Sequence, residues 1–273
     1  MHDKHPGTDE TNIDDKPMRT RITHFHRLCF TCLIVLLSGT TGCDKTVTET
    51  WEADSLSQWM PLVPGRSVTY RLDSTVYISN NTAKVVRSYI VKDIVESAFT
   101  DNTGRKAYRV LRRLRDAKDT LQWNPNAVFT ATPTGSSIEW VDNNLRFIRL
   151  SMPLRDGFTW KGNSYINTLT DPNLQYLDDW TYKLDSVGKP KTLDGRTFNE
   201  TLTVNQRNEV INNPGDKSRY FSVTRSRDVY AKGIGLVHRE FLHETWQPPN
   251  ISSTTGYYES NSLGIRLSYI RHE

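Results

Sequence analysis

Short segments in which apolar and polar residues alternate make up most of the chain after its first sixty residues. In the segment SVTYRLDSTVY, the apolar residues Val68, Tyr70 and Leu72 alternate with polar ones, which is the period of a half-buried β-strand. The longer segment AKVVRSYIVKDIVES (83–97) is rich in Val and Ile, and turn residues bound it on both sides. Both patterns predict strands.

Further segments of this kind follow as far as the last residues: NAVFTAT, SIEWV, LRFIRLSM, WTYKLDSVG, FNETLTVNQ, YFSVTRSRDVY, GLVHREFLHETW and LGIRLSYIRH. The segment AYRVLRRLRD has the composition of a helix, but the preceding DNTGR is typical of a hairpin turn, so we expect a strand. An Asp-Pro pair opens residues 171–180, and Leu174 and Leu177 share one face there, which predicts a short helix.

About a dozen short strands separated by Gly, Pro and Asn turns predict a mainly β fold. The sheet is expected to be an antiparallel sandwich or a partly open barrel, with at most one or two short helices. Because no change in composition divides them, residues 59–273 are expected to form a single β-rich domain. MPLVPG (60–65) recurs as MPLRDG (152–157), which indicates a turn used twice before a strand, with two duplicated binding lobes as the alternative.

An apolar run, LCFTCLIVLL (28–37), precedes the β-rich part. It is shorter than the roughly 20 residues that a membrane-spanning helix needs, and it has the length of the apolar region of a signal peptide. Three arginines precede the run, and the small residues SGTTG follow it. We therefore expect residues 1–42 to be a signal peptide. The first 17 residues are acidic and unlike the start of such a peptide, which indicates a true start at Met18.

The three cysteines of the chain all lie in or directly after this leader. Cys29 and Cys32 would be removed with it, whereas Cys43 follows small residues, as the lipid-modified cysteine of a lipoprotein does. Several acyl chains on Cys43 would give stable membrane anchoring, where one chain is marginal. An ordinary secretory leader with a free thiol is the alternative, because Thr40 stands where an aliphatic residue is usual. We expect lipid attachment at Cys43, with residues 43–58 forming the anchor and a polar tether.

The charge and the aromatic content of the chain indicate little about its binding partners. The net charge of the chain is +4, and the cationic run RKAYRVLRRLR (105–115) is interpreted as a solvated face of a strand, so no nucleic-acid partner is expected. The seven tryptophans and twelve tyrosines are interpreted as core residues, with a sugar-stacking platform as the alternative.

Motifs that carry chemistry are scarce in this sequence. HREFLHE (238–244) contains two His and two Glu, but on a strand His238, Glu240 and Glu244 share a face while His243 points the other way. We expect solvated strand residues there and no metal site. GIGLVH lacks the third glycine of a dinucleotide-binding motif and is interpreted as a turn. Without a G-x-S-x-G motif, a P-loop or a Cys/His pair, the sequence predicts no catalytic residues, no cofactor and no enzymatic activity.

Four segments together resemble a family of uncharacterised exported lipoproteins of the Bacteroidota: MPLVPGRSVTYRLDSTVY, NNLRFIRLSMPLRDGFTWKGNSYI, VYAKGIGLVHREF and SLGIRLSYIRHE. The shared features are a Pro-Leu-x-x-Gly segment before a strand, a Pro-x-x-x-Gly-x-x-Trp-x-Gly-Asn block and a Tyr-Ala-Lys-Gly-x-Gly-Leu-Val turn. The similarity covers most of residues 59–273, although Val68 stands where the family usually has Trp. The resemblance implies an acyl-anchored, exported, β-rich domain, and it brings no catalytic residues or ligand.

These observations predict a non-enzymatic lipoprotein of the cell envelope. The acyl chains on Cys43 would place it in the outer membrane, on the periplasmic face or at the cell surface. The first hypothesis for its role is a binding or interaction module that contacts a glycan or protein partner. The alternative is a lipid or lipoprotein carrier, with an apolar cavity enclosed by a curved β-sheet.

Overall fold

The computed structural model describes residues 55–118, 122–251 and 253–273. The expected signal peptide (1–42), Cys43 and most of the expected tether lie outside these described residues. Two short helical segments and thirteen strands make up the regular structure of the described part: α2 (Leu56–Trp59), β1 (Ser67–Ile78), β2 (Ala83–Thr100), β3 (Lys106–Asp116), β4 (Asn124–Pro133), β5 (Ser137–Asp142), β6 (Leu145–Ser151), β7 (Thr159–Lys161), η1 (Pro172–Leu177), β8 (Thr181–Leu193), β9 (Arg196–Ile211), β10 (Phe221–Ala231), β11 (Gly235–Gln247), β12 (Tyr257–Tyr258) and β13 (Leu263–His272).

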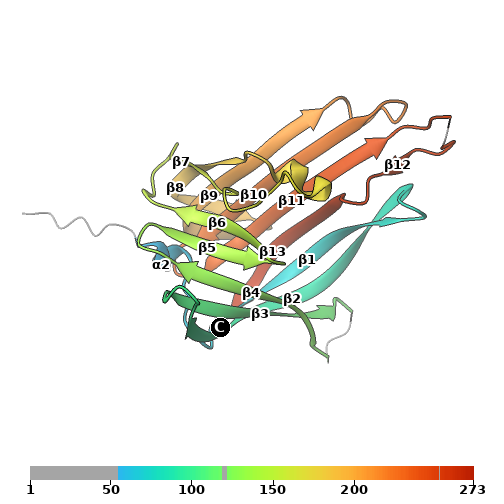
Figure 1. Ribbon diagram of the computed structural model, residues 1–273. Coiled ribbons are helices and arrows are strands. Elements are labelled where there is room, and N and C mark those ends of the chain that lie inside the picture. Colours follow the sequence, from blue (N-terminus) through green and yellow to red (C-terminus); the bar gives the residue numbers. More distant parts are fainter. Residues whose placement is uncertain (1–54, 119–121, 252) are drawn as a thin grey trace, which may run out of the picture. The chain divides into compact units, whose positions relative to one another are not determined.

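All the described strands belong to one antiparallel sheet, in the order β6-β5-β4-β3-β2-β1-β13-β11-β10-β9-β8-β7, with β12 paired to β11 beside this path. Neighbours in the first half are consecutive hairpins, and the C-terminal strand β13 joins β1 to β11. Figure 1 shows the sheet curling so that β4 to β6 lie across from β13 and β1. The prediction of a mainly β, antiparallel fold is confirmed.

The two end strands of the sheet meet along a short seam. The backbone N–H of Ile148 in β6 donates to the carbonyl of Gly162, just after β7, at 2.8 Å. The indole Nε1 of Trp160 in β7 donates to the carbonyl of Ile148, also at 2.8 Å. These contacts make the sheet an almost closed barrel, so of the two expected architectures the partly open barrel is the one found.

Tight turns with positive φ angles join the hairpins. Asp194 and Gly195, between β8 and β9, have φ of 49° and 79°, and Asn143 and Asn144, between β5 and β6, have φ of 48° and 64°. Asp, Asn and Gly tolerate this left-handed conformation best, and a two-residue turn of this kind matches the right-handed twist of paired strands. The sequence therefore fixes the register of these two hairpins locally.

The largest hydrophobic cluster lies inside the barrel and includes the first helix. Trp59 is fully buried, and Leu56 from the same helix is buried beside it, together with Leu150 from β6 and Tyr182 from β8. The backbone N–H of Gly233 donates to the carbonyl of Gln58 at 2.7 Å, which ties α2 to the turn between β10 and β11. The packed part of the chain thus begins before residue 59. Of the described helices, none is long and apolar enough to pass through a bilayer.

The second helical segment, η1, packs its aromatic residue against β11. Asp171 caps it, as the Asp-Pro pair predicted, but the turn is a 3₁₀ helix of six residues and ends at Leu177, short of the expected residue 180. The ring of Tyr176 stacks on that of His243 with 4.0 Å between centroids and 12° between planes. His243 is 3% exposed, and its Nδ1 lies 2.9 Å from the hydroxyl of Thr224.

This packing predicts a pH dependence of stability. Burial disfavours the imidazolium form and lowers the pKa of His243 from 6.5 to about 4. In the unfolded chain His243 is protonated below about pH 6.5, whereas in the folded chain it stays neutral until about pH 4. The contribution of His243 to the free energy of unfolding is therefore largest above pH 6.5 and decreases as the pH falls toward 4. We expect a loss of roughly 1 to 2 kcal/mol over this range, after allowing for partial solvation.

Urea unfolding at several pH values, followed by tryptophan fluorescence, measures this effect. The variant His243→Gln removes the titrating group, so the difference between wild type and variant should shrink as the pH falls from 7.5 to 4.5. Burial also lowers the pKa of His238. Because His238 is present in both proteins, its contribution cancels when the unfolding free energy of the variant is subtracted from that of the wild type. Parallel curves for the two proteins would contradict the assignment to His243.

Candidate functional site: a cationic cavity in the barrel

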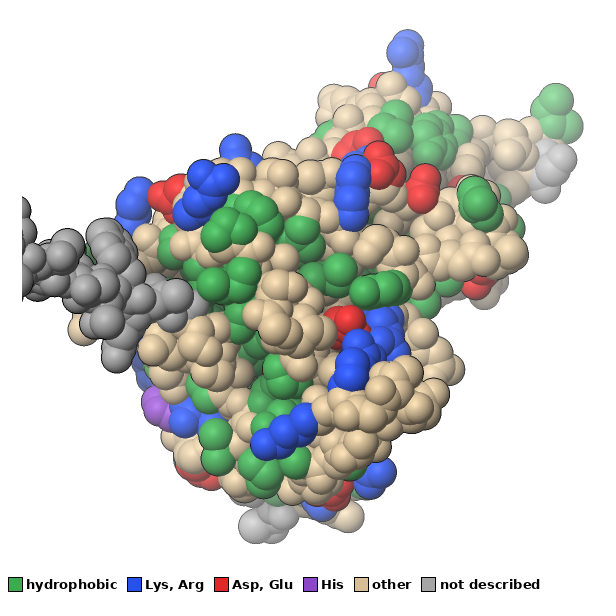
Figure 2. Space-filling model, turned by 60° about the vertical axis from the view of Figure 1, so that its left-hand side comes forward, with side chains coloured by type: hydrophobic (Ala, Val, Ile, Leu, Met, Phe, Trp, Pro, Cys, Tyr) green, Lys and Arg blue, Asp and Glu red, His purple; other side chains and the backbone are tan. Residues whose placement is uncertain are grey.

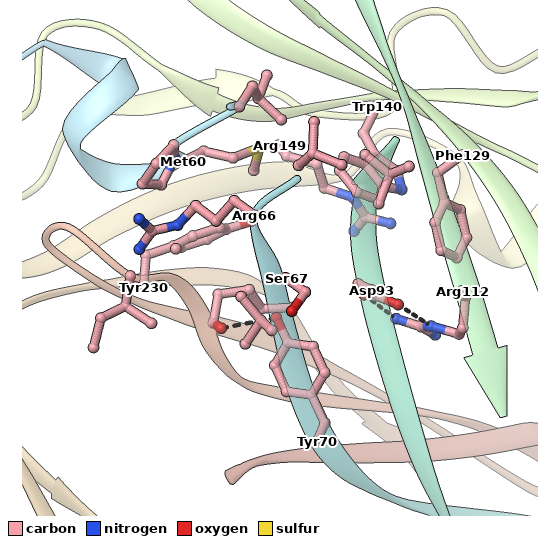
Figure 3. A pocket seen from close by; sticks show the side chains of 18 of the residues that line it. Met60, Arg66, Ser67, Tyr70, Asp93, Arg112, Phe129, Trp140, Arg149 and Tyr230 are labelled. Carbon is pink, nitrogen blue, oxygen red and sulfur yellow. Dashed lines mark hydrogen bonds and ion pairs between the residues drawn. The ribbon is translucent and has the colours of Figure 1, made fainter. Parts of the chain in front are cut away.

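Two cavities in the barrel share two lining residues, Arg149 of β6 and Arg239 of β11. The first, called the central cavity here, has a volume of about 80 Å³ and lies between β1 to β4 and the β10–β11 turn (Figure 3). The second, the side cavity, has about 190 Å³ and is lined by the β5–β6 hairpin, η1, β11 and β13. The arginines therefore border both spaces.

A buried ion pair joins β10 to β11 beside these cavities. Asp228 and Arg239 face each other in the register of the two strands, and Arg239 donates twice to the carboxylate, from Nε at 2.8 Å and from Nη2 at 2.7 Å. The side chain of Asp228 is fully buried. Gln206 and Tyr230 also donate to its Oδ2, at 3.1 and 3.2 Å. The carboxylate is thus surrounded by donors.

A second ion pair of the same design lies across β2 and β3. Asp93 and Arg112 are opposite each other in the register, and Arg112 donates from Nε and Nη2 to the two carboxylate oxygens, each at 2.7 Å. Both side chains are nearly buried. Figure 3 shows this pair on one side of the central cavity, with Tyr70 near it. Each carboxylate of the barrel interior named so far therefore has a bidentate arginine of its own.

Arg149 is a third buried arginine, and neither aspartate forms a hydrogen bond with it. Its side chain is 10% exposed, and its Nη1 lies 3.9 Å from Oδ2 of Asp228, beyond hydrogen-bond distance. Its Nε has no hydrogen-bond partner among the described residues. The guanidinium lies 4.3 Å from the ring centre of Phe147. A buried guanidinium that shares its one close carboxylate with a second arginine is only partly compensated, which is energetically costly and marks this residue as the centre of the site.

The titration of these groups follows from burial and charge. Burial raises the pKa of Asp228, but the charge of Arg239 and its hydrogen bonds outweigh burial and hold that pKa below 3.8. Burial lowers the pKa of Arg239, but the charge and hydrogen bonds of Asp228 raise it by more, so the net shift is upward. Burial raises the pKa of Tyr182 to about 12 and that of Tyr230 above its ordinary value. At neutral pH Asp228 and Arg239 are therefore charged, and Tyr182 and Tyr230 are protonated.

The HREFLHE segment forms part of β11, with the facing that the sequence predicted, but of its His and Glu residues only Glu240, with a side chain 43% exposed, has the expected solvation. His238, His243 and Glu244 are all buried. Glu244 binds Lys84 and the hydroxyl of Tyr77 on the outer side, while His243 packs under η1. Within the described ranges, His, Cys, Asp and Glu form no group of three or more that could hold a metal ion.

The cationic run over residues 105–115 is also only in part a solvated face. Arg109 is 57% exposed, as expected, and Arg113 is exposed as well. Arg112 points into the barrel with an 11% exposed side chain, because it has the same parity along β3 as the buried Tyr108 and Val110. The two-residue spacing from Val110 to Arg112 indicated in the sequence that Arg112 faces inward. The interpretation of the whole run as a solvated face did not take this spacing into account.

Hydrophobic side chains and basic ones lie close together on the surface as well. On the face that Figure 2 draws, hydrophobic side chains form a band that Lys and Arg side chains border. Three of the tryptophans interpreted from the sequence as core residues are buried in hydrophobic clusters: Trp59, Trp180 and Trp246. Cys43, the one site residue that the sequence predicted, lies outside the described residues.

Comparisons with known proteins give a limited result. No protein-family model matches the chain, and no curated protein sequence matches it. Among solved structures, the chain is similar to a Bacteroides fragilis NCTC 9343 protein described as exported, with a YmcC-like fold. The sequences are 11% identical, the TM-score is 0.36, and the match covers 77% of this chain and 96% of that one. It assigns neither a family nor a function, so the resemblance to Bacteroidota lipoproteins stays a prediction.

Proposed function

We propose that this protein is an exported lipoprotein of the cell envelope, anchored through Cys43, that binds a ligand inside its barrel without transforming it. The anchor and the export rest on the sequence alone, that is, on the apolar run of residues 28–37 and the small residues before Cys43. The outer membrane is the proposed location. The binding role rests on the interior of the described barrel.

The observation that supports binding is the pair of cavities on the shared arginines Arg149 and Arg239. Ligand sites are concave, mostly apolar and equipped with a few polar groups that fix orientation, and both cavities have this character. Their volumes, about 80 and 190 Å³, are below the roughly 300–1,000 Å³ usual for drug-sized ligands. The proposed ligand is therefore small, or it is one end of a larger envelope molecule.

Binding is favoured over catalysis by the chemistry of the lining. A general acid or base works best with a pKa near the operating pH. Asp228 has a lowered pKa, and Tyr182 and Tyr230 have raised ones, so these groups hold their protons or their charge across the neutral range. Such groups recognise a ligand by hydrogen bonds and charge, and they are poor at moving protons.

Native mass spectrometry of the full-length protein, extracted from membranes with a non-ionic detergent, tests the binding role. We expect a co-purifying mass at up to one copy per chain. The variant Val68→Phe narrows the central cavity, which Val68 lines, and should reduce the occupancy. The matched control Val86→Phe, at a position 67% exposed on β2, should leave it unchanged. A bare protein mass for the wild type from several growth conditions would contradict the proposal.

A separate experiment tests the anchor. The variant Cys43→Ser cannot form the thioether to diacylglycerol, so we expect it to move from the membrane fraction to the soluble envelope fraction. Metabolic labelling with a radioactive fatty acid should mark the wild type and leave the variant unlabelled. Equal membrane association of both proteins would show that Cys43 is not the anchor, and it would leave the binding role to be judged by mass spectrometry.

A further inference from the structure

The charges inside the barrel do not balance. Three arginine side chains, Arg112, Arg149 and Arg239, are at least 87% buried, while two aspartates, Asp93 and Asp228, accept their bonds. Each aspartate makes a bidentate pair with one arginine, and Oδ2 of Asp228 accepts from two further donors, Gln206 and Tyr230. One positive charge is therefore in excess, and the geometry assigns that excess to Arg149.

The hydrogen-bonding groups around the central cavity are unbalanced in the same direction. Three buried nitrogens that line it have no hydrogen-bond partner among the described residues: Nε of Arg66, Nε1 of Trp140 and Nε of Arg149. All three are N–H donors, and none can accept a hydrogen bond. Figure 3 shows their side chains around one space, with Tyr230 and the Asp93–Arg112 pair completing its border. Whatever satisfies them has to supply acceptor atoms.

The rest of the lining makes these unsatisfied donors more costly. Leu62, Val95, Val110 and Phe129 contribute apolar surface to the central cavity, and an excess charge in such surroundings is strongly destabilising. A volume of about 80 Å³ exceeds the 10–15 Å³ or so that one water molecule needs on this measure. The space is large enough for a small charged group.

We infer that the central cavity binds an oxyanion, a carboxylate or a phosphate group, with Arg149 as its counter-ion and Trp140 and Arg66 as additional donors. This inference rests on the proposed binding function and names the chemistry of its ligand. The oxyanion is either a free ion or the charged end of an amphiphile whose apolar part lies along the cavity wall. Asp142 lines the side cavity, where its charge acts on Arg239, and no ion pair joins it to Arg149 among the described residues.

Thermal unfolding of the full-length protein with defined probes tests this. The probes are inorganic phosphate, acetate, octanoate and the uncharged octanamide, at one ionic strength set with sodium chloride. A ligand that binds the folded state raises Tm with its concentration. We expect octanoate or phosphate to raise Tm in a saturable way and octanamide to have no effect. A response to octanoate far above that to acetate identifies an amphiphile, and equal responses to the small ions identify a free anion.

Variants of Arg149 connect the effect to the site. Arg149→Met should weaken binding of the anionic probe roughly tenfold or more, since a hydrogen bond to a charged group is lost. Its Tm without probe should equal or exceed that of the wild type, because the excess positive charge is gone. Arg149→Lys, which keeps the charge, should retain part of the response. Arg113→Met, which removes an exposed arginine of β3, should retain all of it.

Several outcomes would overturn the inference. Equal responses to octanoate and octanamide would show an apolar site without selectivity for charge, and the proposed binding function would stand. A full response in Arg149→Met, or a Tm well below the wild type without probe, would assign Arg149 a purely structural role. The absence of any response to the anions would mean that water satisfies the three donors. The mass-spectrometric result decides the proposed function independently of all three.

Discussion

Replacing Asp228 by Asn is expected to lower the free energy of unfolding by about 3–5 kcal/mol. The change keeps the shape of the side chain but removes the negative charge from a fully buried position. Arg239, which donates twice to this carboxylate, is then buried without a counter-ion, and Arg149 loses the nearest anion it has. The loss is larger than that of a hydrogen bond, because two positive charges remain uncompensated.

Urea or guanidinium unfolding at pH 7, followed by tryptophan fluorescence, measures this loss. The control Asp194→Asn removes the partner of Arg266 at the surface, where both side chains are about half exposed, and should cost less than about 1 kcal/mol. The double variant Asp228→Leu with Arg239→Met should recover part of the stability, because the charge of Arg239 is removed together with that of Asp228, while buried Arg149 still lacks a counter-ion. A single-variant loss no larger than the control would contradict the buried-charge account.

Replacing Trp59 by Ala is expected to cost about 3–5 kcal/mol, the range for removing a large buried aromatic side chain. Trp59 is fully buried in the main cluster, although its helix α2 has only four residues. So short a helix has little stability of its own, and its position depends on this side chain and on the hydrogen bond from Gly233 to Gln58. The loss would show that α2 supports the folded barrel.

Two controls accompany this variant in the same unfolding measurement. Trp59→Phe keeps most of the apolar contact, and the indole N–H has no partner among the described residues to lose, so we expect a cost of about 1–2 kcal/mol. Val63→Ala, at a site 57% exposed, should change the stability by less than about 0.5 kcal/mol. A Trp59→Ala protein as stable as the wild type would mean that α2 does not support the barrel.

The period-two pattern predicted the strands well because each strand has one face inside the barrel. It identified β3 against its helical composition, since DNTGR forces a hairpin there, and Tyr108 and Val110 are buried as alternation requires. Helix α2 could not be predicted in the same way. Four residues are too few for a helical period, and only packing against the barrel explains why Leu56 and Trp59 are buried.

The candidate site was harder to predict because it depends on register. Arg112 and Arg239 have the strand parity of inward residues, so their direction was available from the sequence. Their partners were not, since Asp93 and Asp228 are found only by pairing β2 with β3 and β10 with β11. Bulges at Val95 and at Val229–Tyr230 shift the register within those same strand pairs. The excess charge of Arg149 follows only when all the pairs have been assigned.

The short seam between β6 and β7 also affects how the molecule behaves among its own copies. An open sheet has two edges with unpaired backbone groups, and such edges can add strands from another chain. Here two hydrogen bonds, from Ile148 to Gly162 and from Trp160 to Ile148, join the two end strands, and β7 has only three residues. At the seam itself, little backbone is left for strand addition. On a crowded membrane, where the proposed anchor would concentrate the protein, this closure would limit edge-to-edge association at the seam.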